Sequence, residues 1–174
     1  LEPNPTSRRY AVPVCSRLKA FLEREGVSYT TVDHPLAYSA QDVARAVHVG
    51  ARTMVKTIVV DADGRTYMVA VAASQRVSPR KLQDALGASH VRLKREDDLA
   101  AIFEDCEPGA MPPFGVLYDM PVVADPVLWM DEDIEFNAGD HLTVVKMKFA
   151  DFERLVHPIQ AEVTGDPDED LYWR

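Results

Sequence analysis

Residues 54–73 decide the fold, and they read Met54-Val55-Lys56-Thr57-Ile58-Val59-Val60-Asp61-Ala62-Asp63-Gly64-Arg65-Thr66-Tyr67-Met68-Val69-Ala70-Val71-Ala72-Ala73. Two apolar runs, 54–60 and 66–73, flank a short segment that ends in Asp63-Gly64. An Asp-Gly pair between two such runs is a strong hairpin signal, because both residue types tolerate the backbone of a tight turn. This stretch therefore predicts two antiparallel strands.

Outward from this hairpin, helical patterns alternate with further β-rich runs. Ser39 and Ser78 are expected to cap helices, with Pro79 at the first helical position and Gly87 at the end. Strands interleaved with helices, some of them hairpin-connected, predict a single α+β (mixed α/β) domain with a mixed sheet. The expected helices cover 13–26, 40–48, 79–87, 96–103 and 150–156, and the other expected strands cover 28–32, 90–93, 116–118, 121–124, 134–137 and 141–147.

The bulk composition bounds the class of protein. The chain has 174 residues, of which 47% are hydrophobic and 27% charged, and this matches one globular domain. We expect an N-terminal extension over 1–11, a domain over 12–158 and an acidic tail over 159–174, frayed or docked only through Trp173. No apolar run approaches the ~20 residues of a membrane span, and the first residues do not resemble a signal peptide, so we expect a cytoplasmic protein without membrane contact.

The charge is unevenly distributed along the chain. The net charge of −9 by itself speaks against a nucleic-acid partner. Between Arg45 and Arg95, however, ten basic residues stand against three acidic ones, whereas from Glu96 onward four basic residues stand against twenty acidic ones. This asymmetry permits a basic surface on an acidic protein, and a solvated face of mixed charge is the alternative interpretation.

Lys56 is the one charged residue in an otherwise apolar strand, 54–60. Alternation would place it on the same face as Met54 and Ile58, where an unpaired charge is costly. Either the strand borders a wet cleft or Lys56 meets an anion such as a phosphate. The alternative is a lysine on an edge strand that reaches solvent.

The segment 107–115 reads Glu107-Pro108-Gly109-Ala110-Met111-Pro112-Pro113-Phe114-Gly115. Its glycines allow close backbone approach and its prolines hold a shape, so we expect a structured loop rather than a helix or strand. Such a loop can aim backbone N–H groups at a carbonyl oxygen, as an oxyanion hole requires. Ordinary turn chemistry explains the same residues.

The remaining reactive side chains give no clear motif. The five histidines lack the spacing of metal ligands, and Cys15 and Cys106 lie far apart in the sequence, so we expect no metal, no other cofactor and no disulfide framework. Asp33-His34 reads as a catalytic dyad or as a turn that ends a strand. Cys106 beside the loop would need a neighbouring base to act as a nucleophile.

Several of these segments together resemble the YbaK/prolyl-tRNA-synthetase-associated editing domain, over about residues 12–158. The Lys56 strand and the loop 107–115, present in this order, are the most specific parts of the resemblance. The matching segments are Asp33-His34-Pro35, Ser39-Ala40-Gln41-Asp42, Met54-Val55-Lys56-Thr57, residues 109–115, Phe136-Asn137-Ala138-Gly139-Asp140-His141 and Asp151-Phe152-Glu153-Arg154-Leu155.

The resemblance implies a mixed, partly closed β-sheet flanked by helices, with a pocket for the 3′ end of a charged tRNA. It implies metal-free hydrolysis of the ester between a mischarged amino acid and the terminal ribose. Lys56 would hold the terminal adenosine and its phosphate, Gly109 would grip the aminoacyl carbonyl and position water, and His141 matches a histidine that is functional in some members. The implied substrate-binding residues are Ala110, Met111, Pro112, Pro113, Phe114, Gly115, Asn137 and Gly139.

The resemblance also implies a tRNA surface and leaves two rivals. The expected tRNA contacts are Arg45, Arg52, Arg76, Arg80 and Lys81, with Lys94 nearby. Because the sequence shows no synthetase domain, we expect action in trans, with a synthetase as candidate partner. The amino acid removed stays open among alanine, cysteine, serine, threonine and non-protein residues. The rivals are a non-catalytic module that binds an aminoacyl group or tRNA end, and a small ester or amide hydrolase using Cys106 with His34 or His141.

Overall fold

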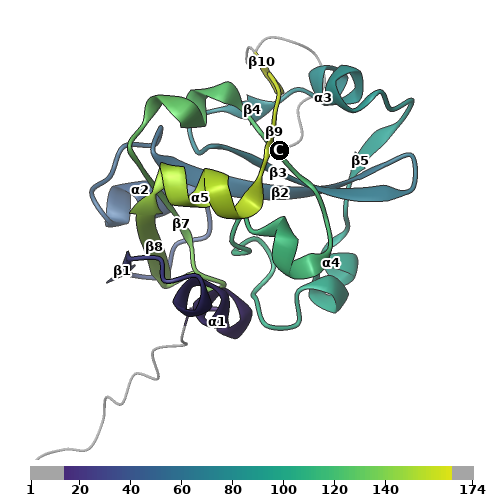
Figure 1. Cartoon of the computed structure of the whole chain (residues 1–174). Helices are drawn as coiled ribbons and strands as arrows, with labels where there is room; N and C mark the ends of the chain where they lie inside the picture. Colours follow the sequence, from purple (N-terminus) through teal and green to yellow (C-terminus); the bar gives the residue numbers. More distant parts are fainter. Residues whose placement is uncertain (1–13, 166–174) are drawn as a thin grey trace, which may run out of the picture.

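The computed structural model describes residues 14–165, so the expected N-terminal extension and residues 166–174 of the expected tail, including Trp173, lie outside the described residues. An eight-stranded mixed sheet occupies the centre, with helices on both of its faces (Figure 1). The elements are α1 (Ser16–Arg24), β1 (Tyr29–Asp33), α2 (Ala40–Ala46), β2 (Met54–Ala62), β3 (Arg65–Ala72), β4 (Arg76–Val77), α3 (Pro79–Leu86), β5 (Val91–Leu93), α4 (Glu96–Ile102), the 3₁₀ helix η1 (Gly115–Tyr118), β6 (Val122–Ala124), the 3₁₀ helix η2 (Pro126–Met130), β7 (Asp133–Asn137), β8 (Thr143–Lys148), α5 (Phe149–Val156), β9 (Ile159–Gln160) and β10 (Thr164–Gly165).

Strands β2 and β3 form the predicted hairpin. They pair antiparallel from Val55 opposite Ala72 to Ala62 opposite Arg65. The turn residues Asp63 and Gly64 have φ angles of 49° and 88°, the left-handed backbone that an Asp-Gly turn supplies. This confirms the hairpin as the centre of the sheet.

The strand order of the large sheet is β1-β8-β7-β2-β3-β6-β9, and β5 also pairs with β2. β2 with β7, β3 with β6 and β6 with β9 are parallel pairs, whereas the others are antiparallel. The α+β class with a mixed sheet is therefore confirmed. The partly closed sheet that the resemblance implies is wrong. Within residues 14–165 the strand order begins at β1 and ends at β9, and these two edge strands do not pair, so the sheet is open.

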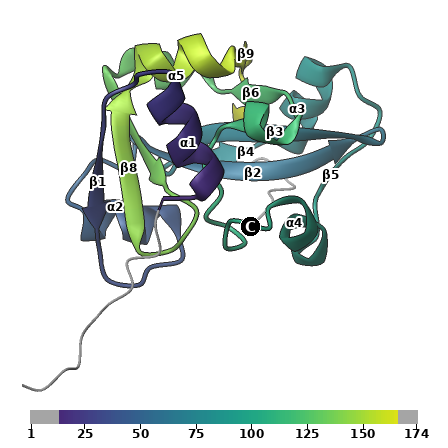
Figure 2. The same ribbon diagram turned by 60° about the horizontal axis from the view of Figure 1, so that its bottom comes forward.

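Apolar side chains on both faces of the sheet hold the helices in place. On one face, α1 and α5 contribute Leu22 and Phe152 to the largest cluster, and α1 lies beside β8 (Figure 2). On the other face, Leu82 of α3 packs with Val60 and Val71. Val43 of α2 packs at the end of the sheet with Met54, in a third cluster. Strand alternation thus sends successive side chains of β2 into different clusters.

The predicted caps are present. The Ser39 hydroxyl accepts a hydrogen bond from the Asp42 N–H, and the Ser78 hydroxyl accepts one from the Lys81 N–H. Pro79 begins α3 and Gly87 ends it with a φ of 62°. Because these signals are local in the sequence, they place α2 and α3 closely.

The predicted strand over 116–118 is wrong, because this segment forms the 3₁₀ helix η1. The Leu117 and Met120 amides donate to the Phe114 and Gly115 carbonyls, so the chain turns back at once. A side chain at Gly115 would lie 2.4 Å from the Met120 carbonyl oxygen. The close approach that this glycine permits overrides the β-propensity of the residues that follow it.

Short elements beyond the sequence expectation complete the fold. Asp125 caps η2 by accepting from the Val127 N–H. Residues 159–165, expected to belong to the tail, carry β9 and β10, which pair with β6 and β4. Among the helices of residues 14–165, none has the length and apolar character needed to cross a lipid bilayer.

Candidate active site

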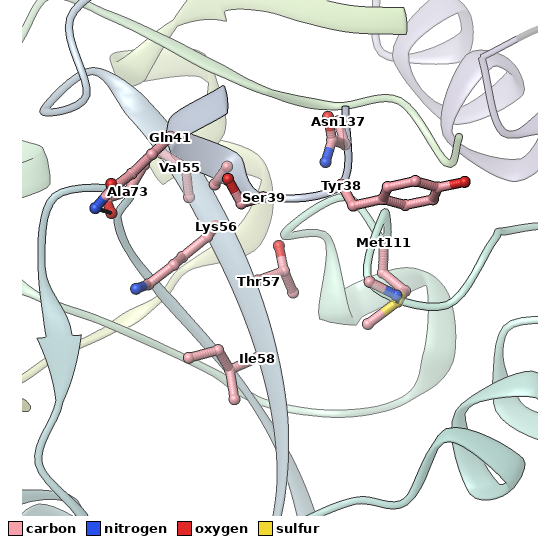
Figure 3. A pocket seen from close by; sticks show the side chains of 12 residues that line it. Tyr38, Ser39, Gln41, Val55, Lys56, Thr57, Ile58, Ala73, Met111 and Asn137 are labelled. Atoms are coloured by element: carbon pink, nitrogen blue, oxygen red, sulfur yellow. Dashed lines mark hydrogen bonds between the residues drawn. The ribbon is translucent and has the colours of Figure 1, made fainter. Parts of the chain in front are cut away.

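A pocket of about 330 Å³ lies where one edge of β2 is open (Figure 3). On the side opposite β3, β7 pairs with Met54 and Val55, and β5 pairs with residues 60–62. Within the described part of the chain, no strand pairs with residues 56–58 on this side. An open strand edge presents backbone donors and acceptors to a bound molecule. The lining residues are Tyr38, Ser39, Ala40, Gln41, Val55, Lys56, Thr57, Ile58, Ala73, Gly109, Met111 and Asn137.

Lys56 is half-buried in this pocket, which matches the wet cleft considered from the sequence. Figure 3 shows its side chain on the Ala73 side of β2, whereas Thr57 points toward Met111. The Lys56 Nζ donates a hydrogen bond to the Gln75 carbonyl. Burial lowers the pKa of the Lys56 ammonium, and the positive charge of Arg76 lowers it further. An anion bound here would offset both effects.

A polar network behind Lys56 fixes its carbonyl partner. The Gln75 side-chain amide donates to the Thr164 hydroxyl over 3.0 Å, and that hydroxyl donates to the Asp125 Oδ2 over 2.9 Å. Buried Asp125 also accepts from the Val163 amide at 3.2 Å. The segment 159–165 therefore helps to hold the turn on which Lys56 rests.

Gly109 brings a backbone amide to the pocket wall. Its φ of 85° is a left-handed conformation that glycine adopts without strain. Its N–H donates to the Met111 Sδ over 3.2 Å. A thioether sulfur is a weak acceptor, so this amide gives up its partner readily to a carbonyl oxygen or an oxyanion.

Thr57 and Asn137 carry buried polar atoms that face the same pocket. Within residues 14–165, the Thr57 Oγ1 and the Asn137 Oδ1 have no hydrogen-bond partner. Buried polar atoms are almost always paired, so such atoms in a pocket indicate a polar ligand. Asn137 was predicted as a substrate-binding residue, whereas Thr57 was not singled out, because it reads as one more residue of an apolar strand.

His141 lies behind the loop rather than in the pocket lining. Its Nε2 lies 3.0 Å from the Pro108 carbonyl oxygen, and its backbone N–H donates to the Glu107 carboxylate. The exposed ring of Tyr38, which does line the pocket, lies 4.9 Å from the imidazole between centroids. His141 thus connects the loop to the pocket rim, and sequence reasoning did not identify Tyr38.

Most other predicted substrate-binding residues pack into the protein. Of the loop, Gly109 and Met111 line the pocket, whereas the five remaining candidates are buried away from it. Gly139 is also buried, and a side chain on it would lie 2.7 Å from the Cys15 Cβ. The five buried loop residues are Ala110, Pro112, Pro113, Phe114 and Gly115.

The candidate tRNA-contacting residues lie on elements around β2, and several contact acids. Arg45 pairs with Asp42 at 3.0 Å, Arg52 pairs with Asp131 at 2.6 Å, and Lys81 contacts Glu162. Lys94 pairs with Asp61 at 3.5 Å. Arg76 and Arg80 are exposed, near the Lys56 end of the pocket and at the start of α3 respectively.

Cys106 and His34 are not among the residues that line the pocket. A hydrogen bond with Cys15 raises the pKa of the Cys106 thiol, and burial raises it further. His34 is buried just after β1, with its Nδ1 2.7 Å from the Pro35 carbonyl oxygen. These positions fit the strand-ending turn and oppose a Cys106 nucleophile with a histidine base.

The fold and the pocket together define the class of protein. The model of the aminoacyl-tRNA editing domain family matches residues 34–155, which include every lining residue of the pocket, and the chain belongs to this family.

Particular relatives cover most of the chain. The prolyl-tRNA editing protein ProX of Acetoanaerobium sticklandii is 27% identical over 143 residues, 79% of this chain and 87% of that protein. The multifunctional Ser/Thr-tRNA deacylase ProXp-y of Escherichia coli K12 is 28% identical over 147 residues, 82% of this chain and 87% of that protein. A solved structure of a candidate trans-editing enzyme for prolyl tRNA synthetase superposes with a TM-score of 0.77 at 19% identity, over 88% of this chain and 98% of that one, and shares the fold.

Proposed function

We propose that this chain is a trans-acting aminoacyl-tRNA deacylase, which hydrolyses the ester between a mischarged amino acid and the terminal ribose of tRNA. Membership of the editing family supports this activity. Relatives named as a prolyl-tRNA editing protein and a Ser/Thr-tRNA deacylase, each covered over 87% of its length, support action without an attached synthetase. The carrying observation is that a cation, a weakly held amide and two unpaired polar atoms line one pocket.

In this proposal Lys56 binds the phosphate of the terminal adenosine. Its ammonium is half-buried beside the similarly charged Arg76, so an anion there stabilises the protonated form. Lys56 binds the anion and does not act as a base, because only the protonated ammonium attracts the phosphate. The ribose and its ester then lie over the open edge of β2.

The Gly109 amide stabilises the negative charge that develops on the ester oxygen. An aminoacyl ester is already activated, so the enzyme must mainly orient water and stabilise the oxyanion. The exchange of the Met111 sulfur for an oxyanion strengthens the hydrogen bond of this amide. Removal of one such donor typically costs about 10²–10³ in rate.

Asn137 and Thr57 orient the reacting groups. The Asn137 side-chain oxygen receives the α-ammonium of the amino acid, and the Thr57 hydroxyl holds the attacking water. The vicinal ribose hydroxyl assists the proton transfer from water to the leaving oxygen. The proposal requires no metal and no protein nucleophile, and it makes His141 the residue that holds the loop through Pro108.

The acceptor stem of tRNA contacts the basic residues around β2. The exposed side chains of Arg76 and Arg80 meet phosphates. Arg45, Arg52 and Lys81 also meet phosphates, each in exchange for a carboxylate partner. We place this activity in the cytoplasm, with a synthetase as candidate partner.

A panel of mischarged tRNAs tests the function. Wild-type chain is incubated with tRNAs that carry alanine, serine, threonine or cysteine and with correctly charged prolyl-tRNA, and the remaining ester is measured through a labelled terminal adenosine. We expect hydrolysis of at least one mischarged ester while prolyl-tRNA is spared. A chain that binds these tRNAs but leaves every ester intact is the non-catalytic module instead.

The same reaction distinguishes attack by the Cys106 thiol from direct attack by water. Samples quenched in acid during a single turnover are analysed by mass spectrometry of the intact protein. A Cys106 nucleophile would accumulate an acyl-thioester adduct, whereas direct water attack leaves the protein mass unchanged.

A further inference from the structure

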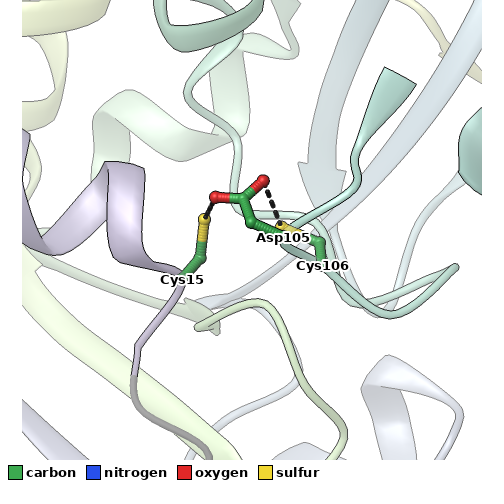
Figure 4. A group of neighbouring side chains, drawn as sticks. All are labelled: Cys15, Asp105 and Cys106. Carbon is green, nitrogen blue, oxygen red and sulfur yellow. Dashed lines mark hydrogen bonds between the residues drawn. The ribbon is translucent and has the colours of Figure 1, made fainter. Parts of the chain in front are cut away.

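A second cluster of chemically reactive side chains lies outside the pocket (Figure 4). Cys15 precedes α1, Asp105 and Cys106 follow α4, and Tyr118 ends η1. Although 91 positions separate the two cysteines in the sequence, the fold brings them together with the carboxylate between them. The sequence expectation of no metal site rested on their spacing, which gives no sign of this approach.

The donor atoms of the cluster have the separations of a metal site. The Cys15 Sγ, Cys106 Sγ and an Asp105 carboxylate oxygen all lie within 4.8 Å of one another. The Tyr118 hydroxyl oxygen lies 3.4 Å from the Cys15 Sγ and 3.5 Å from the Cys106 Sγ. Ligands bound to tetrahedral Zn²⁺ at its usual bond lengths lie about 3.5–3.8 Å apart. Small side-chain rotations therefore suffice to surround one ion.

The carboxylate of Asp105 gives the cluster a negative charge that favours a bound cation. The Cys15 thiol donates to its Oδ2 over 2.6 Å, and the Tyr118 hydroxyl donates to its Oδ1 over 2.9 Å. A divalent cation in this cluster would interact with the Asp105 carboxylate and with both sulfur atoms at once.

Gly139 makes room for the two thiols. A side chain there would lie 2.7 Å from the Cys15 Cβ and 3.4 Å from the Cys106 Sγ. The Cys15 amide donates to the neighbouring Ala138 carbonyl over 2.6 Å, which fixes the start of α1. The backbone around the cluster is thus held in place independently of any ion.

We propose that Cys15, Cys106 and Asp105 bind a thiophilic divalent cation of the Zn²⁺ class, with the Tyr118 hydroxyl as fourth ligand or as hydrogen-bond donor to Asp105. Binding breaks two S–H bonds, releases two protons to solvent and forms two metal–sulfur bonds without electron transfer. The ion links α1, the segment before the loop 107–115 and η1. It stabilises the fold and lies outside the pocket lining, so it takes no part in ester hydrolysis.

Spectroscopic titration with Co²⁺ tests this site. The full chain, reduced and stripped with a chelator, is titrated with Co²⁺ and then with competing Zn²⁺. We expect one ion per chain, a thiolate-to-Co²⁺ charge-transfer band, the visible bands of tetrahedral Co²⁺ and full displacement by Zn²⁺. Zn²⁺ should also raise the melting temperature.

Matched variants assign the ligands. Asp105→Asn should weaken Co²⁺ binding by more than the about 10–100-fold that is lost when a residue that only supports the ligands is changed. Asp119, which follows Tyr118 in the sequence, is exposed, so Asp119→Asn should bind Co²⁺ like wild type. Cys15→Ser and Cys106→Ser should each diminish the charge-transfer band, with circular dichroism as the check on folding. Octahedral Co²⁺ spectra without a thiolate band, or equal binding by Asp105→Asn and wild type, would overturn the proposal. These readouts need no tRNA, so they stand apart from the deacylase proposal.

Discussion

At the scale of single residues, the two glycines of the loop 107–115 have different tasks. A side chain on Gly109 would meet the His141 Cε1 at 3.6 Å, an ordinary contact, whereas one on Gly115 would overlap the Met120 carbonyl oxygen. Gly109 therefore matters for its backbone conformation and its amide. Gly115 matters for close packing.

Gly109→Ala should impair catalysis more than folding. A left-handed alanine costs about 1–2 kcal/mol, which a domain of this size tolerates, but the strain shifts the amide that faces the ester. Misplacement by about 1 Å is worth about 10²-fold in rate, so we expect a loss of that order in kcat with a cooperative melting curve retained. Single-turnover kinetics and thermal denaturation of one preparation measure both. A wild-type rate would remove Gly109 from the mechanism.

The lowered pKa of Lys56 predicts how tRNA binding depends on pH. Its ammonium loses the proton, and with it the attraction for phosphate, as the pH rises through a pKa that burial and Arg76 hold below the ordinary range of lysine. The affinity for uncharged tRNA should therefore fall within the alkaline range. Arg76→Gln removes a like charge, which raises the pKa of Lys56 and moves the decline to higher pH.

Fluorescence anisotropy at constant ionic strength between about pH 7 and 10 checks this shift. Arg80→Gln serves as control, because it removes a positive charge that does not lower the pKa of Lys56. It should weaken binding without moving the midpoint. The same midpoint in Arg76→Gln and wild type would contradict the assigned coupling.

The sequence identified some residues of the pocket and not others, for a physical reason. Lys56 stands out in the sequence because it is a charged residue in an apolar strand. Gly109 stands out because it belongs to a segment rich in glycine and proline. Tyr38 and Thr57 agree with their sequence surroundings, and only tertiary structure brings them to the pocket. Likewise Pro112 and Phe114 shape the loop from within the core.

At the scale of elements, Gly115→Ala should destabilise the fold. The new Cβ would lie 2.4 Å from the Met120 carbonyl oxygen and 2.7 Å from the Val122 Cγ2, so η1 or β6 must shift. Overpacking of this kind costs about 1–3 kcal/mol. Urea denaturation measures the change, and Gly50→Ala serves as control, because neither Gly50 nor Gly115 has a positive φ and a Cβ on Gly50 would meet no atom closer than 3.9 Å. Equal losses in the two variants would show that packing at Gly115 is unimportant.

Elements set by local signals were predictable, and elements set by contacts were not. The β2–β3 turn and the caps of α3 follow from neighbouring residues and are confirmed. The helix η1 depends on Met120 and Val122, which approach from the next strand. The Asp125-Pro126 start of η2 carried a usable cap signal, whereas the two-residue strands β9 and β10 exist only through their partners.

At the scale of the whole molecule, the net charge of −9 and the basic segment around β2 predict modest, salt-dependent tRNA binding. The six phosphate contacts proposed, one by Lys56 and five by the surrounding basic residues, would give a slope of about −4 to −5 for the logarithm of the association constant against that of the salt concentration. Arg80→Gln should remove one phosphate contact and so reduce the magnitude of the slope by about 0.7–0.9. Arg154→Gln, on α5 and paired with Asp151, should leave it unchanged. An affinity indifferent to salt would contradict an electrostatic tRNA surface.

The overall class was predictable from the order of motifs, whereas the assembly of distant segments was not. The pocket joins residues from 38 to 137, and the thiol cluster joins Cys15 to Cys106. Sequence periodicity specifies which face of an element is apolar, but it does not specify which other element covers it. This is why the open edge of β2 and the metal-site geometry required the structure.

The central claim is that the pocket at Lys56 hydrolyses the ester of mischarged tRNA. The direct measurement is the single-turnover rate on the best substrate of the tRNA panel, with wild-type chain and Lys56→Ala at saturating enzyme and equal folded fraction. We predict rapid hydrolysis by wild type and a rate lower by about 10² or more in Lys56→Ala, because the ester is no longer held over the Gly109 amide. Equal rates for the two proteins would contradict the account.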